Sequence, residues 1–268
     1  MAVLPFLSHW AEFVERFAGK VTWLELNITL DLKSLALVER LLERFGGPLC
    51  RNLSRIDAQS YPPNGPNDCC TALLELLLSS NLEEVGLPWD TAYSTTRANL
   101  SLLARRSPHI LNLTVSKHEA FNYAIFTNLR SLWHYGSLSL ADYTMLASLP
   151  HPRILRFFHS SISNEQYNNG SVINFPSLQE VFLSNVTAEI FRAIEQSMMP
   201  ALRTFHIDGA RLTLLDHALQ ASPLLEDLHL EINTSSRELK LRTHERIRTL
   251  VLTNDVDSKC DWKDDNLY

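Results

Sequence analysis

A short phrase recurs along the second half of the chain and constrains its fold more than any other feature. The phrase is a proline, a leucine or isoleucine two residues later, and apolar residues five and seven positions after the proline. Its copies begin at Pro152, Pro176, Pro200 and Pro223, and the first apolar residues are Ile154, Leu178, Leu202 and Leu225, followed by Ile247. Self-similarity at a fixed period indicates stacked units, because no single unit can bury its apolar face alone.

The same frame extends toward the N-terminus with the proline mostly lost. An L-x-x-L-x-L core at a period of roughly 20–29 residues is typical of a leucine-rich repeat. About ten strands are predicted between Val21 and Thr253. The earlier copies are Val21, Leu24 and Leu26; Leu53, Ile56 and Ala58; Leu82, Val85 and Leu87; Ile110, Leu113 and Val115; and Leu129, Leu132 and His134.

The segments between these strands follow a helical period instead. Apolar residues from Leu35 to Phe45 recur at helical spacing and stop at Gly46-Gly47. Further helices are predicted at 69–78, 96–103, 143–149, 190–198 and 212–219. Alternation of strand and helix predicts an α/β leucine-rich-repeat solenoid, curved, with parallel strands on its concave face and helices on its convex face.

Three segments are expected from this pattern. Residues 1–20 are predicted to form an N-terminal capping helix, 21–253 the repeats, and 254–268 an acidic, flexible tail.

Composition excludes several partner classes. The net charge is −6, the pI is about 5.9, and no basic patch is present, so a nucleic-acid partner is not expected. No apolar stretch approaches the roughly 20 residues that span a bilayer, and the N-terminus lacks the features of a secretory signal. The four cysteines match no zinc spacing, which favours reduced thiols in a cytoplasmic or nuclear protein. One pattern argues for the opposite compartment: N-glycosylation at Asn-x-Ser/Thr motifs would place the chain outside the cell. The motif occurs at Asn27, Asn52, Asn99, Asn112, Asn169, Asn185 and Asn233.

Alternation along each strand assigns a concave surface. Its middle is predicted to carry an aromatic patch flanked by Arg156 and Glu180, and large aromatics beside an arginine are the usual energetic centre of a protein interface. The alternative is that another segment of the same chain covers the patch. The four aromatic residues are Trp133, Tyr135, Phe158 and Phe182.

Histidines and acids follow the aromatic patch along the same surface. His206 and His229 are predicted to lie beside Asp208 and Glu231, as a pH-sensitive acidic end of the partner site. The two histidines could in principle ligate a metal, but solvated or paired side chains are the commoner arrangement, so no metal or cofactor is predicted.

Two other histidines occupy positions where the frame predicts inward apolar residues. These are His134 and His159, in adjacent repeats. The preferred interpretation is a pair of hydrogen-bonded core histidines, and the alternative is a pH-sensitive seam.

Catalytic patterns are missing from the sequence. It contains no glycine-rich phosphate loop, no G-x-S-x-G and no H-E-x-x-H. Arg105-Arg106 could supply an arginine finger to a GTPase partner. The preferred interpretation is that these basic residues complement the helix dipole at the C-terminus of their helix. A non-enzymatic binding protein is therefore expected.

The segments at 103–115 (LARRSPHILNLTV) and 219–230 (LQASPLLEDLHL) resemble the repeats of F-box/leucine-rich-repeat proteins, especially the large fungal set. The resemblance implies an adaptor that holds a substrate on the repeat arc, in a ubiquitin-ligase complex. Residues 1–20 are too short for an F-box, so a ligase scaffold is expected as partner only if an F-box lies elsewhere in the native protein. The alternative function is a repeat-type regulator or inhibitor of an enzyme, such as a ribonuclease or a small GTPase.

Overall fold

The computed structural model describes most of the repeat region predicted from the sequence. The residues described are 16–28, 32–60, 72, 74–87, 97–117, 121–162, 172–208, 220–232 and 246–254. The expected acidic tail lies outside them apart from residue 254, as does the expected capping helix apart from residues 16–20, of which 16 and 17 are helical.

Among the residues that the structure describes, ten strands form one parallel sheet and follow each other in chain order. Two further short strands pair with each other instead. This confirms the α/β class and the parallel pairing of consecutive strands. The strands of the large sheet are β1 (Trp23–Ile28), β2 (Arg55–Ser60), β3 (Glu84–Leu87), β4 (Asn112–Lys117), β5 (Ser131–Leu138), β6 (Ile154–Ile162), β8 (Glu180–Ser184), β10 (Thr204–Asp208), β11 (Asp227–Ile232) and β12 (Thr249–Asn254).

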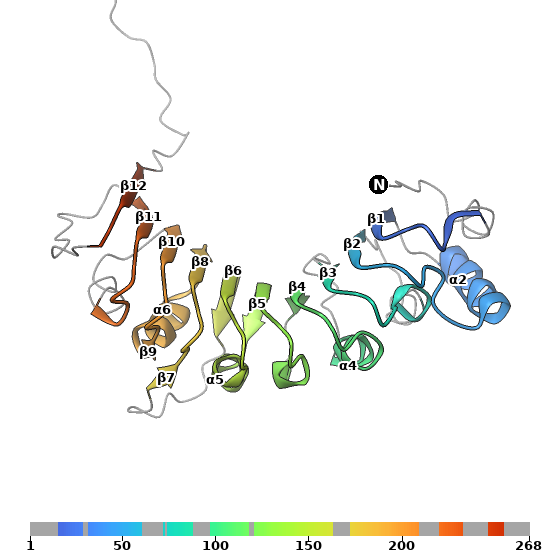
Figure 1. Cartoon of the computed structure of the whole chain (residues 1–268), viewed down its shortest axis with the longest axis horizontal. Helices are drawn as coiled ribbons and strands as arrows, with labels where there is room; N and C mark the ends of the chain where they lie inside the picture. The colour runs from blue at the N-terminus through green and yellow to red at the C-terminus, as the bar shows by residue number, and fades with distance from the viewer. Residues whose placement is uncertain are drawn as a thin grey trace, which may run out of the picture.

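Helices and a small second sheet flank the large one. The sheet bends into an arc whose inner side is lined by the strands, and α2, α4, α5 and α6 lie on the outer side with β7 and β9 (Figure 1). The bounds are α2 (Leu32–Phe45), α4 (Arg97–Arg106), the 3-10 helix η2 (Tyr123–Ile125), α5 (Leu140–Ser148), β7 (Ile173–Asn174), α6 (Ala188–Glu195) and β9 (Ser197–Met198).

The same backbone contact joins each unit to the next, just before the strand. One carbonyl oxygen accepts hydrogen bonds from two successive amide N–H groups of the following unit. At the centre of the arc, the Arg130 carbonyl accepts from the N–H of Arg153 at 2.8 Å and of Ile154 at 3.0 Å. The other acceptors are the carbonyls of Thr22, Ser54, Glu83, Leu111, Arg153, Gln179, Arg203 and Glu226.

The core lies between the sheet and the outer elements. Inward side chains of successive strands stack in register, for example Leu113 on Leu132 and Val181 on Phe205, and all four are buried. In six of the described units the leucine that opens the unit also closes a tight turn, as when the Leu178 N–H donates to the Phe175 carbonyl at 3.4 Å. A row of such leucines buries apolar area along the whole arc, which is the main stabilising contribution.

The predicted frame is wrong at Pro152. The repeat pattern predicted that Ile154 and Leu178 occupy equivalent positions in adjacent units. In the structure Ile154 instead pairs with Glu180, and Leu155 pairs with Val181. Pro152 is therefore the equivalent of Leu178 and is buried, while Ile154 is half-buried on the inner face of the arc. The error left Phe158 on the correct face because strand side chains alternate with a period of two, and the shift is also two residues.

The prediction for His159 is also wrong. His159 is exposed with φ of 47°, and the β5–β6 register shifts between Tyr135 and Ser137, so that β6 carries an extra residue. Such a bulge turns a side chain off its expected face. Ser160 is fully buried beside it, and its hydroxyl donates to the His134 carbonyl at 3.0 Å.

His134, in contrast, lies where the sequence placed it. Its side chain is fully buried between Val115 and Phe157 in the register of three neighbouring strands. Its Nδ1 lies 3.5 Å from the Ser160 Oγ. The interpretation of His134 as a core histidine therefore holds for this residue of the pair.

The expected helices at 96–103, 143–149 and 190–198 correspond to α4, α5 and α6, with shifted ends. Residues 72 and 74–77 are helical within the expected segment 69–78, and 212–219 lies outside the described residues. Arg105 and Arg106 form the basic last turn of α4. Within the described segments, no helix is both long and apolar enough to cross a bilayer.

Two side chains bear on the compartment signals. Asn99 is buried in α4, which blocks its use as a glycosylation acceptor in the folded chain. Cys50 is a free, buried thiol, and burial raises its pKa, which keeps the thiol protonated and unreactive.

Candidate functional site

Aromatic rings line the middle of the inner face on three adjacent strands. Trp133 and Tyr135 come from β5, Phe158 from β6 and Phe182 from β8. All four side chains are half-buried, and their separate strands bring together residues far apart in sequence. We call these four residues the aromatic patch.

Phe158 is the centre of the aromatic patch. Its ring stacks on Tyr135 with centroids 4.8 Å apart, and lies 5.1 Å from Phe182 and 6.0 Å from Trp133. Aromatic pairs at such separations contribute about 0.5–1.5 kcal/mol beyond area burial. The patch is therefore pre-packed and presents ring faces and edges at little cost in side-chain entropy.

Arg156, rather than Phe158, is the direct neighbour of Trp133 on the next strand, because of the shifted register of β6. Its Cζ lies 4.4 Å from the centroid of the Trp133 ring. Its Nε and Nη2 both donate to Glu180 Oε1, at 2.9 and 2.6 Å. Arg156 thus combines a cation–π contact with an ion pair across β6 and β8, which fixes the guanidinium plane.

Tyr135 is the titratable group of the aromatic patch. Burial raises the pKa of its hydroxyl, and the nearby positive charge of Arg156 lowers it by a smaller amount. The hydroxyl is therefore protonated at neutral pH and remains able to donate a hydrogen bond.

The stack of rings continues into the expected histidine end. Phe182 stacks on His206 with centroids 4.1 Å apart, and His206 stacks on His229 at 5.4 Å. His206 Nε2 lies 2.7 Å from Asp208 Oδ1, and Asp208 pairs in register with Glu231 on β11. In the part of the chain that the structure describes, no three His, Cys, Asp or Glu side chains are grouped so as to hold a metal.

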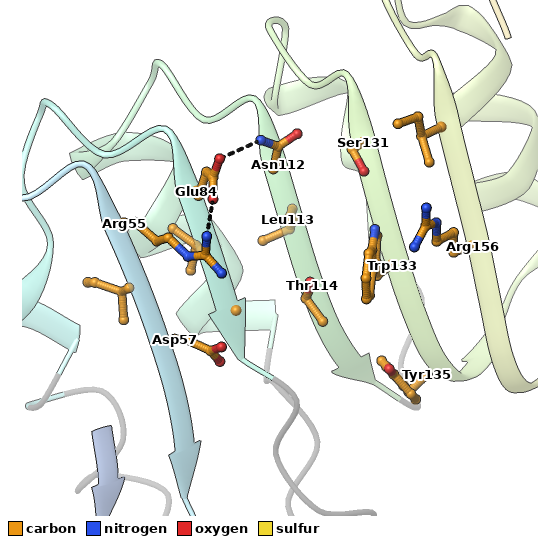
Figure 2. Close-up of a pocket in the computed structure, with 14 residues that line it drawn as sticks. Arg55, Asp57, Glu84, Asn112, Leu113, Thr114, Ser131, Trp133, Tyr135 and Arg156 are labelled. Atoms are coloured by element: carbon orange, nitrogen blue, oxygen red, sulfur yellow. Dashed lines mark hydrogen bonds and ion pairs between the residues drawn. The ribbon is translucent and has the colours of Figure 1, made fainter. Parts of the chain in front are cut away.

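A hollow on the other side of the patch was missed by the sequence reasoning. It has a volume of about 440 Å³ and lies over β2 to β6, with the patch residues Trp133 and Tyr135 at one end (Figure 2). Gly86, in the same outward row as Trp133, was the available signal, because glycine leaves a gap in a row of side chains. The polar side chains around the hollow are Arg55, Asp57, Glu84, Asn112, Thr114, Ser131 and Arg156.

Charges at the hollow are partly paired with each other. Arg55 Nη1 lies 3.3 Å from Glu84 Oε2, and the Asn112 side-chain amide donates to Glu84 Oε1 at 3.2 Å. The guanidinium of Arg55 also covers the ring of Trp23 at 4.8 Å. These contacts hold the Arg55 side chain toward Trp23 of β1. The space above Gly86, which has no side chain, stays open.

No protein-family model matches the chain, and no curated protein matches it at a significant level. The fold and the site define an α/β protein with a ten-stranded parallel sheet whose inner face carries a pre-packed aromatic patch beside a polar hollow.

Proposed function

We propose that the chain is a non-enzymatic protein–protein interaction scaffold of the leucine-rich-repeat type, which binds its partner on the inner face of the arc. The observation that carries this proposal is the aromatic patch with Arg156 and Glu180 beside it. Half-buried aromatics and an arginine are the residues that dominate interface energetics when a partner excludes water from them. The histidine end, with His206, Asp208, His229 and Glu231, extends the same surface.

The repeating backbone joint and the curved sheet support the leucine-rich-repeat solenoid. Each unit bonds to the next through one carbonyl, and outer elements alternate with inner strands. A stack of this kind offers an extended inner surface whose side chains vary independently of the scaffold.

A narrower form of the proposal is the substrate-recognition part of an F-box-type ubiquitin-ligase adaptor, which rests on the sequence resemblance. It predicts that the protein bound by the inner face is degraded more slowly when the aromatic patch is removed. The regulator alternative predicts instead that the bound partner is an enzyme whose turnover changes on binding.

The test of the scaffold is capture of partners from native lysate by two triple-alanine variants and the unaltered chain. One variant removes Trp133, Phe158 and Phe182. The matched control removes three exposed apolar residues outside the inner face, Ile125, Met145 and Met198. We expect a partner to be lost only with the first variant, while circular dichroism shows both variants folded. An unchanged partner set in the first variant would contradict the proposal.

A further inference from the structure

The hollow over Gly86 has a shape set by one missing side chain. Glycine stands on β3 between Asp57 of β2 and Thr114 of β4, in the register of three parallel strands. A Cβ atom at Gly86 would lie 2.9 Å from Asp57 Oδ1. The glycine thus allows the carboxylate to lie against β3 and leaves the floor of the hollow open.

Most charges around the hollow have partners, and Asp57 is the exception among the described residues. Glu84 is bound by Arg55 and Asn112, and Arg156 is bound by Glu180. Within the described part of the chain no cation lies at ion-pair distance from Asp57. Glu25 of β1 pairs in register with Asp57 and is also half-buried, so a second carboxylate stands next to Asp57, outside the lining of the hollow.

The opposite wall is an aromatic ring. Trp133 stands between Thr114 and Arg156, and Arg156 covers one of its faces (Figure 2). The other face lies toward Thr114 and the hollow. A carboxylate that no cation of the described residues pairs with, and a ring face across a floor of small residues, form a site with charge complementarity to a cation.

We propose that the hollow over Gly86 receives a lysine or arginine side chain of the protein bound by the inner face. Asp57 accepts hydrogen bonds from the cation, and the side-chain stem packs on Trp133. This rests on the proposed function and names a chemical feature of the partner. An acidic side chain would be repelled by Asp57 and Glu25, and an apolar one would desolvate Asp57 with no compensating bond.

The experiment uses small probes, so that it needs no knowledge of the partner. The probe is N-acetyl-arginine amide, and its neutral isostere, N-acetyl-citrulline amide, is the control. A ligand of about fifteen non-hydrogen atoms is expected to bind in the millimolar range. Binding is followed by the NMR signal of the Trp133 indole N–H, assigned by its loss in Trp133→Phe.

We expect the arginine probe to bind at least about fivefold more tightly than the citrulline probe. Asp57→Asn should abolish that difference. The matched control is Glu83→Gln, which removes the same charge from an exposed position just before β3 and should leave the difference intact. Gly86→Val should fill the hollow and weaken both probes, with circular dichroism as the check on folding.

Three results would overturn the inference: equal binding of the two probes, no shift of the Trp133 signal at about 50 mM probe, or equal effects of Asp57→Asn and Glu83→Gln. Failure of the proposed function is distinguishable. Loss of a partner from the aromatic variant without arginine binding rejects only the cation site. If the arginine probe binds but the aromatic variant captures the same partners as the unaltered chain, the proposed scaffold function is rejected. The assignment of the hollow to a side chain of its partner is then rejected with it.

Discussion

At the scale of single residues, position on a strand decides what a side chain can do. Ile154 and Leu155 are adjacent and both apolar, yet Leu155 is buried against Val181 while Ile154 lines the hollow. The sequence frame assigns Ile154 to the core, and the structure assigns it to the inner face. The two assignments predict different energetic costs for the same substitution.

Ile154→Ala is therefore expected to lower the free energy of unfolding by about 1 kcal/mol or less, because little buried area is lost. Leu155→Ala is expected to cost about 2–5 kcal/mol, because it leaves a cavity in the core. Urea unfolding of the two variants measures both values. If Ile154→Ala lowered the free energy of unfolding more than Leu155→Ala, the alignment predicted from the sequence, with Ile154 in the core, would be correct after all.

A second residue-scale prediction concerns the pair of Arg156 and Glu180. A double-mutant cycle with alanine at both positions should give a coupling of about 1 kcal/mol in unfolding free energy, because the half-buried guanidinium makes two bonds to one carboxylate oxygen. The comparison pair is Arg203 and Glu226, 3.6 Å apart with the arginine 58% exposed. Its coupling should be below about 0.5 kcal/mol, and equal couplings would show that the paired geometry adds nothing.

At the scale of elements, α5 illustrates how helix ends link the outer layer to its neighbours. Ser139 caps the helix by accepting from the Asp142 N–H at 3.0 Å, and the Asp142 carboxylate accepts from the Ser139 N–H at 3.2 Å. The same buried carboxylate accepts from the Phe121 N–H at 2.7 Å. The capping box therefore also anchors the segment that leads into η2.

Asp142→Ala should destabilise more than Ser139→Ala. Removing the serine hydroxyl costs about 1 kcal/mol, as for other N-caps. Removing the carboxylate takes the acceptor from two buried N–H groups and should cost about 2–4 kcal/mol. Thermal and urea unfolding measure the order, with the exposed Ser148→Ala as a control near zero. The reverse order would mean that the capping hydroxyl, not the carboxylate, holds the two segments.

At the scale of the whole molecule, each strand of the large sheet pairs only with its neighbours in the arc. Stability in such a stack is close to a sum over units and the interfaces between them. Terminal units have one interface instead of two, so opening should begin at the ends. The small β7–β9 sheet and the ring contacts add interactions near the centre.

Amide hydrogen exchange should therefore be slowest in β5, β6 and β8 and become faster toward β1 and β12. Exchange followed by mass spectrometry after peptic digestion resolves these segments. Leu183→Ala, in the core of β8, should accelerate exchange in neighbouring strands more than in β1. Equal protection along the arc, or a uniform response to the variant, would indicate a single cooperative unit instead.

The sequence determined which residues face inward and which face outward along most of the arc, because alternation in a strand is a local property. For the same reason, alternation alone was enough to place Trp133, Tyr135, Phe158 and Phe182 on one surface. It could not fix the register of β6, since a shift of two residues preserves alternation and the alignment is selected by backbone bonds to the neighbouring strands, including those to the Arg130 carbonyl. The bulge at His159 and the hollow between Asp57 and Trp133 likewise depend on side chains and backbone from different strands. Tertiary structure alone decided these features, because they arise from contacts between units, and a repeated phrase describes only the unit.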